Sequence, residues 1–281
     1  MQTIYFKMKG AESNNIDDWI HYRSKRGKLT FSRQELVSDF SYLSEQTVKN
    51  NLNLLIKKGE IFPVFKGFYS VIPVDYALIG IVPPEFYIDD LMKYLSRTYY
   101  VSLLNAAAYY GAAHQKPQTL SVITSLPTLR DTIKKNTRIA FISTRKEIPQ
   151  KWLKTLRGEN GDFYVSKPEL TAVDLITFQK EIGGLNRACT VLYELMEVVK
   201  FGKLDNFFFD YVPTASIQRL GYLIENELKH KKQAAILFSK AQIYACKFQK
   251  IPLKQSKSIV DCETNAKWKI IINETIETDS L

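Results

Sequence analysis

The stretch SEQTVKNNLNLLIKKGEIFPVFKGFYSV, residues 44–71, carries the signals of a helix followed by two short strands. Ser44 suits a helix N-cap, because its hydroxyl can accept from a backbone N–H of the first turn, and Gly59 suits the left-handed residue that ends a helix. Two short apolar runs follow, at residues 61–65 and 68–72, and the Lys66-Gly67 step between them favours a tight reversal. The stretch predicts a helix followed by a hairpin. These two elements are either a DNA-binding helix with its wing or a hairpin that only packs beside a helix.

The residues before this stretch complete a familiar order of elements. Residues 15–25 have apolar side chains at helical spacing, and residues 29–31 resemble a short strand. Ser32 and Glu35 form a capping box, in which each side chain accepts from the other residue's backbone N–H, and they open a short helix that runs to Phe40. Helix, strand, helix, turn, helix and hairpin is the order of a winged helix-turn-helix, which we expect over residues 1–75.

The predicted helix has one face that must pack inward and one that is left for a partner. Val48, Leu52 and Leu55 form an apolar stripe at helical spacing. At about 100° per residue, the opposite side carries two asparagines, a glutamine and a lysine. Asn and Gln side chains can pair with the adenine edge in the major groove, and Lys neutralises phosphates. The candidate DNA-binding residues are Ser44, Gln46, Thr47, Lys49, Asn50, Asn53, Lys57 and Lys66.

The charge of the chain is compatible with a nucleic-acid partner. The formal net charge is +10, and such a basic balance favours acidic partners, although a lysine-rich solvated surface gives the same number. Residues 1–75 hold eleven Lys/Arg against eight Asp/Glu, a net +3. This modest value predicts binding as a dimer or cooperatively to paired half-sites. Winged helices that bind proteins stay an alternative.

A second basic region lies at residues 200–260, which hold eleven Lys/Arg against four Asp/Glu. It is either a second nucleic-acid contact or a set of lysines that the helix dipole favours at helix C-termini.

The N-terminal MQTIYFKMKG lacks the apolar core of a signal peptide, and no later run is long enough to span a bilayer. The three widely spaced cysteines argue against a disulfide framework and a zinc site, so we expect a cytoplasmic protein without a metal or other cofactor.

Residues 80–281 are expected to form a larger mixed domain after a proline-marked linker, so the predicted fold class is α+β. Helices are expected at residues 85–95, 101–110, 168–178, 185–199 and 216–229, and strands at 119–124, 138–143, 162–165, 234–238 and 267–272, with a short basic helix between the first two strands.

No catalytic motif stands out in this second domain. Asp89 and Asp90 are adjacent, so on a helix they diverge and cannot easily share a metal, and His114 is a lone histidine. Glu227-Leu-Lys229 has the letters of a nuclease motif but lies in a helical pattern rather than on a strand. Gly183-Gly184 lacks the lysine and hydroxyl residue of a phosphate loop. We expect a protein that is not an enzyme.

The order of four segments resembles the AbiEi antitoxins of type IV toxin–antitoxin systems, which act in abortive infection, a form of phage defence. The segments are KGFYSVIP, PPEFYIDDLMKYL, YYVSLLNAAAYYGAAHQKPQTLSVIT and SKPELTAVDLI, and the similarity extends to about Phe178. The resemblance implies a cytoplasmic bacterial or archaeal repressor that binds inverted repeats in its own promoter. It also implies a C-terminal domain that counteracts a nucleotidyltransferase toxin without a stable complex. By this similarity, Ser44, Gln46, Thr47, Asn50, Asn53 and Lys66 match the reading helix and wing.

Two other hypotheses stay open at the level of the sequence. A transcription regulator without a toxin partner would carry the same winged helix, and it is favoured if the adjacent gene encodes no nucleotidyltransferase. A nuclease-like second domain predicts metal-dependent cleavage that is lost when Glu227 is changed.

Overall fold

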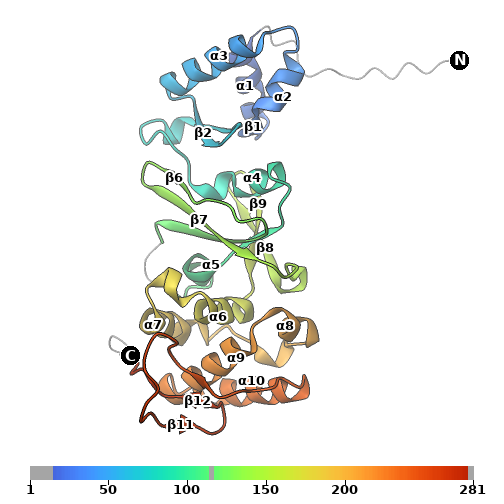
Figure 1. Cartoon of the computed structure of the whole chain (residues 1–281). Helices are drawn as coiled ribbons and strands as arrows, with labels where there is room; N and C mark the ends of the chain where they lie inside the picture. The colour runs from blue at the N-terminus through green and yellow to red at the C-terminus, as the bar shows by residue number, and fades with distance from the viewer. Residues whose placement is uncertain (1–14, 114–116, 278–281) are drawn as a thin grey trace, which may run out of the picture. The chain divides into compact units, whose positions relative to one another are not determined.

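The computed structural model describes residues 15–113 and 117–277 (Figure 1). The described residues fall into two compact units. The first takes in residues up to 98 together with 131–139 and 157–163, and the second takes in residues 99–130, 140–156 and 164 onward. The first unit contains the predicted winged-helix segment together with a further helix, and the domain division at residues 75 and 80 stays a prediction.

The winged-helix segment has the predicted order of elements, and each end that the sequence marked is capped as expected. The Ser32 and Glu35 capping box is formed, and Gly59 ends the third helix with a φ of 74°. The strands form a three-stranded antiparallel sheet in the order β1-β3-β2, with Phe31 opposite Tyr69. The elements are α1 (Ile16–Lys25), β1 (Thr30–Ser32), α2 (Arg33–Asp39), α3 (Glu45–Lys58), β2 (Ile61–Phe65) and β3 (Phe68–Val71).

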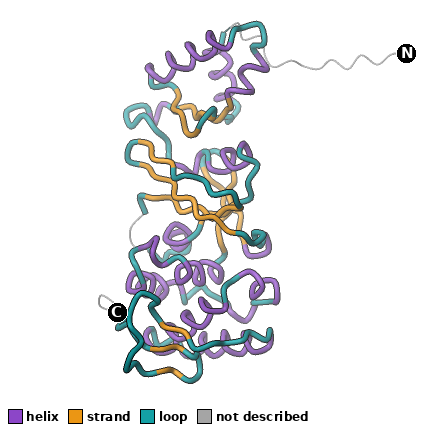
Figure 2. The backbone as a smooth tube through the Cα atoms, in the orientation of Figure 1, coloured by secondary structure: helices purple, strands orange, loops and turns teal. Residues whose placement is uncertain are grey.

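The remaining elements confirm the predicted α+β class (Figure 2). Short 3₁₀ turns and a π-helical turn at Leu223–Glu227 accompany them. The helices are α4 (Ile88–Tyr94), α5 (Leu103–Tyr109), α6 (Pro168–Thr177), α7 (Leu185–Leu195), α8 (Asn206–Tyr211), α9 (Thr214–Tyr222) and α10 (Lys231–Ile243). The strands are β4 (Tyr99–Val101), β5 (Thr119–Ser125), β6 (Thr132–Lys134), β7 (Thr137–Thr144), β8 (Leu153–Gly158), β9 (Gly161–Ser166), β10 (Ile251–Pro252), β11 (Thr264–Asn265) and β12 (Ile270–Ile271).

A mixed six-stranded sheet has the order β6-β7-β5-β4-β9-β8. Strand β4 pairs antiparallel with β5, where Tyr100 faces Ile123, and parallel with β9, where Val101 faces Val165. A small sheet of the order β10-β12-β11 lies near the C-terminal end of the chain. These short, mixed pairings explain why no regular strand–helix–strand rhythm was visible in the sequence.

Two sequence predictions in this part of the chain were wrong. The short basic helix expected before residue 138 is β6, which pairs antiparallel with β7. The strand expected at residues 234–238 lies inside α10. A short apolar run such as AAILF suits a buried helix face as well as a strand, and periodicity alone cannot separate the two.

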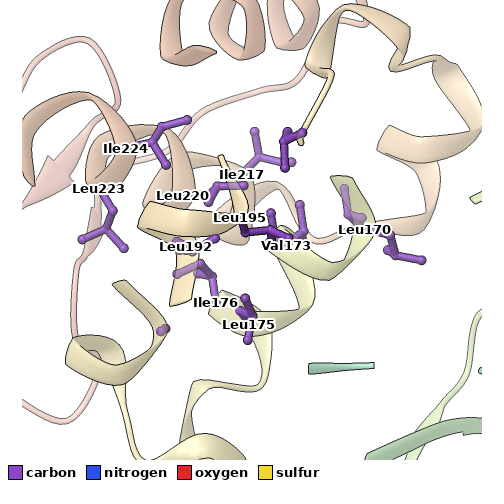
Figure 3. Close-up of a cluster of buried hydrophobic side chains, with 14 of the residues drawn as sticks. Leu170, Val173, Leu175, Ile176, Leu192, Leu195, Ile217, Leu220, Leu223 and Ile224 are labelled. Carbon is purple, nitrogen blue, oxygen red and sulfur yellow. The ribbon is translucent and has the colours of Figure 1, made fainter. Parts of the chain in front are cut away.

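The core of the second unit is built by helices α6, α7 and α9. Figure 3 shows aliphatic side chains of these helices gathered in one cluster, including Ile176 from α6, Leu192 from α7 and Leu220 from α9. Helix α6 is buried on every side, because each residue from Glu169 to Ile176 is buried. The winged-helix segment has a separate, smaller core formed by Ile16, Trp19, Ile20, Phe31, Leu36, Phe40, Val48, Leu52, Leu55 and Ile61.

Candidate nucleic-acid interface

Helix α3 begins at a cap that uses two of the predicted DNA-binding residues. The Ser44 hydroxyl accepts from the Thr47 backbone N–H at 3.1 Å and lies 2.8 Å from the Thr47 hydroxyl. Ser44 is exposed and Thr47 is half-buried. The backbone N–H groups of the first turn therefore point along the helix axis at an accessible end, which is a suitable position for a phosphate group.

The apolar stripe predicted from the sequence orients the helix. Val48, Leu52 and Leu55 are all buried against the small core of the winged-helix segment. Burying this stripe leaves the opposite side of the helix exposed, as the 3.6-residue period requires. Gln46, Lys49, Asn50, Asn53 and Lys57 are all exposed.

Two amide side chains on the exposed side of α3 are hydrogen-bonded to each other. The Gln46 Nε2 donates to the Asn50 Oδ1 at 2.9 Å, one helical turn apart. This bond orders both side chains and leaves one amide oxygen on Gln46 and one amide nitrogen on Asn50 for another partner. Asn53 has no side-chain hydrogen bond within the part of the chain that the structure describes.

The charged side chains of α3 differ in whether they form ion pairs. Glu45 pairs with Arg33 at 2.8 Å, and Lys58 pairs with Asp17 at 3.3 Å and with Glu60 at 3.8 Å. Across residues 15–113 and 117–277, neither Lys49 nor Lys57 forms an ion pair. The two cations on the outward side are therefore available to neutralise phosphates, whereas those on the flanks are already engaged.

The predicted wing is a two-residue hairpin turn. Phe65 pairs with Phe68, so only Lys66 and Gly67 lie outside the ladder. Gly67 has a φ of 75°, a conformation that a residue with a Cβ rarely adopts. The Lys66 side chain is exposed at this turn. The structure thus brings all eight predicted residues to α3 and the wing turn, although Ser44 and Thr47 also serve the helix cap.

The second unit holds a buried polar cluster that the sequence did not indicate. The carboxylate of Asp174 on α6 accepts from the Ser102 hydroxyl at 2.7 Å and from the Tyr100 hydroxyl at 3.2 Å. The Tyr100 and Tyr211 hydroxyls lie 3.1 Å apart. Burial raises the pKa of Asp174 from its ordinary 3.8 to about 7, while the Ser102 and Tyr100 hydrogen bonds act in the opposite direction. Asp174 is only 4% exposed, and the cluster ties β4, α6 and α8 together.

The lysines of residues 200–260 do not share one environment. Lys254 and Lys257 both pair with Glu274, at 2.9 and 2.5 Å. Lys231 and Lys232 lie in the first turn of α10, where the helix dipole disfavours cations. The explanation of these two lysines as dipole-favoured C-terminal residues was therefore wrong, and a nucleic-acid contact at this region stays a prediction.

The residues considered for catalysis are engaged in ordinary structural contacts. Asp89 pairs with Lys93 at 2.5 Å within α4. The Glu227 Oε1 accepts from the Tyr222 hydroxyl at 3.0 Å at a π-helical turn, not on a strand. Among the residues that the structure describes, no group of three or more His, Cys, Asp or Glu could hold a metal ion. His114 lies outside the described residues. Cys189, Cys246 and Cys262 are free thiols.

None of the helices described for this chain has the length and apolar character needed to cross a membrane.

The fold has a counterpart among solved structures. The structure is similar to the crystal structure of the RV2827C protein from Mycobacterium tuberculosis, with a TM-score of 0.62 and 12% sequence identity. The similarity covers 90% of this chain and 89% of that chain, and at this identity it concerns the fold alone. A comparison with curated protein sequences finds no match.

The family comparison identifies the central part of the chain. The model of the AbiEi antitoxin C-terminal domain matches residues 100–226. This range begins at Tyr100 in β4 and includes the buried cluster around Asp174 and the core helices α6, α7 and α9. Residues 100–226 therefore form an AbiEi antitoxin C-terminal domain, and the resemblance of this chain to the AbiEi antitoxins is confirmed.

Proposed function

We propose that this chain is the antitoxin of a type IV toxin–antitoxin system and that it represses its own operon. The AbiEi domain at residues 100–226 supports the antitoxin role. The exposed side of α3 supports binding to DNA, because it carries Gln46, Asn50 and Asn53 together with Lys49 and Lys57, two cations that form no ion pair with any described residue. In this proposal α3 lies in the major groove of one half of a promoter inverted repeat, and Lys66 contacts the phosphate backbone.

The net charge of +3 over residues 1–75 supports binding to paired half-sites. A small number of phosphate contacts per copy gives weak binding by one copy, so two copies on an inverted repeat would supply the necessary affinity. Binding as a dimer or cooperatively therefore belongs to the proposal.

The second task is to counteract a nucleotidyltransferase toxin in the cytoplasm without forming a stable complex with it. Co-expression with the neighbouring gene tests this task. We expect the full chain to relieve the growth arrest caused by that gene, and a pull-down to recover no stable pair. If growth arrest persists when both genes are expressed at matched levels, the antitoxin role is contradicted. The remaining hypothesis is then a transcription regulator without a toxin partner.

The two tasks are separable if they reside in different parts of the chain. A variant with Gln46→Ala and Asn50→Ala changes only exposed positions of α3. We expect it to lose repression of a promoter reporter while still relieving growth arrest. Loss of both activities by a folded variant would show that DNA binding and neutralisation are not independent.

A further inference from the structure

Both carbonyl groups of the wing turn are hydrogen-bonded to elements outside the hairpin. In a two-residue turn the carbonyl oxygens of the two central residues do not take part in the strand ladder. The Gly67 oxygen accepts from the Arg33 backbone N–H at 2.8 Å, at the start of α2. The Lys66 oxygen accepts from the Tyr94 hydroxyl at 3.2 Å, at the end of α4. The turn that carries Lys66 is therefore held from two sides.

Tyr94 holds the wing through its ring as well as its hydroxyl. The Tyr94 and Phe68 rings are stacked, with centroids 5.1 Å apart and an interplanar angle of 29°. A Cβ at Gly67 would lie 3.0 Å from the Tyr94 hydroxyl oxygen. Glycine at this position therefore serves both the turn geometry and the close approach of Tyr94.

Asp90 makes a second contact from the same side of α4. Its carboxylate accepts from the Thr30 hydroxyl at 2.5 Å, and Thr30 pairs with Ser70 of β3. Asp90 and Tyr94 are four residues apart, so they lie on one face of the helix. One face of α4 thus holds β1 at one end and the wing turn at the other.

A cavity of about 440 Å³ lies beside these contacts. Phe68, Asp90 and Tyr94 line it, together with polar side chains such as Arg23 and Glu35. Phe68 is only 4% exposed, so the wing turn is held by apolar packing as well as by the contacts of Asp90 and Tyr94.

We propose that Asp90 and Tyr94 are positioning residues of the DNA interface, an inference that rests on the proposed function. By holding the Lys66 carbonyl, Tyr94 keeps the wing turn ordered before DNA arrives, so less conformational entropy is lost when the Lys66 ammonium meets a phosphate. Asp90 holds the adjoining sheet through Thr30. Neither residue needs to touch DNA.

The test is the salt dependence of binding by the full chain to a duplex from the sequence directly upstream of its gene, with a scrambled duplex as reference. Lys66→Ala is expected to reduce the slope of log affinity against log salt by about 0.9, the contribution of one phosphate contact. Tyr94→Phe removes only the hydroxyl, and we expect it to weaken binding roughly 2- to 10-fold, the size of one net hydrogen bond. In the Lys66→Ala background the same change should have no further effect.

Tyr193→Phe is the matched control, because Tyr193 is 40% exposed and Tyr94 is 39% exposed. If Tyr94→Phe does not fold, Thr30→Val removes the Asp90 contact instead and should weaken binding in the same direction. Affinity unchanged by Tyr94→Phe, or a loss that adds fully to that of Lys66→Ala, overturns this inference alone. Absence of preferential binding by the unaltered chain, or an unchanged slope for Lys66→Ala, overturns the assignment of the wing to DNA as well.

Discussion

Helices α3 and α6 use polar residues in opposite ways. Helix α3 buries Val48, Leu52 and Leu55. Its opposite side leaves five of the candidate DNA-binding residues exposed, namely Gln46, Lys49, Asn50, Asn53 and Lys57. Helix α6 exposes none of its residues from Glu169 to Ile176, and its polar groups bond internally. The Glu169 carboxylate accepts from the Lys200 N–H at 2.9 Å, and Asp174 accepts from Ser102. The polar residues opposite the apolar stripe of α3 therefore face solvent, whereas those on α6 form bonds inside the second unit.

Truncating one leucine on each helix should affect stability very differently. Leu175 on α6 is 0% exposed, and Leu54 on α3 is 49% exposed. We expect Leu175→Ala to lower the free energy of unfolding by about 2–5 kcal/mol, because it leaves a cavity in a packed core. Leu54→Ala should change it by about 0.5 kcal/mol or less. Urea denaturation measures both, and equal costs would contradict the contrast between the two helices.

The buried carboxyl of α6 predicts a pH dependence of stability. The pKa of Asp174 is raised from 3.8 to about 7 by burial, so the folded state holds this proton more tightly than the unfolded state does. This contribution to stability is fully present below pH 4. It is lost as the pH rises to about 7, at a rate of roughly 1.4 kcal/mol per pH unit.

We expect Asp174→Asn to remove this fall from the curve of unfolding free energy against pH. The matched control is Asp261→Asn, because Asp261 is exposed and asparagine tolerates its left-handed φ of 57°. A curve for Asp174→Asn that still parallels the unaltered chain between pH 4 and 7 would assign the pH dependence to other groups.

On α3 the corresponding polar residues should affect affinity instead of stability. We expect Gln46→Ala and Asn50→Ala each to weaken binding to the upstream duplex by about 1–3 kcal/mol, the size of one lost base contact. The thermal midpoint should stay nearly unchanged, since both side chains are exposed. Gln255→Ala, at an exposed position of the second unit, serves as the control in the same gel-shift titration. If the affinity of both variants equals that of the unaltered chain, Gln46 and Asn50 do not contact the DNA bases.

The smallest expected effect concerns the cap of α3. Ser44→Ala removes the acceptor for the Thr47 N–H and should cost about 1 kcal/mol of stability. Ser44→Asn keeps a capping oxygen and should preserve most of that stability. Chemical denaturation of the two variants checks this prediction, and equal losses would mean that the hydroxyl does not cap the helix.

The winged-helix segment was largely predictable because its signals are local. The capping box of Ser32 and Glu35, the cap at Ser44 and the turn at Gly67 each depend on residues a few positions apart. The second unit was less predictable. The apolar run at residues 234–238 fits strand and helix equally, and the pairing of β6 with β7 could not be inferred from the basic residues around it.

The candidate sites were also predictable only in part. The outward side of α3 follows from the sequence alone, because Val48, Leu52 and Leu55 recur with the helical period and must be buried. By contrast, the contact of Tyr94 with the wing turn and the hydrogen bonds from Tyr100 and Ser102 to Asp174 become visible only in the folded chain. Periodicity and caps record each residue's near neighbours along the chain. Contacts between residues 28 or 74 positions apart depend on how separate elements pack, and no local pattern encodes that packing.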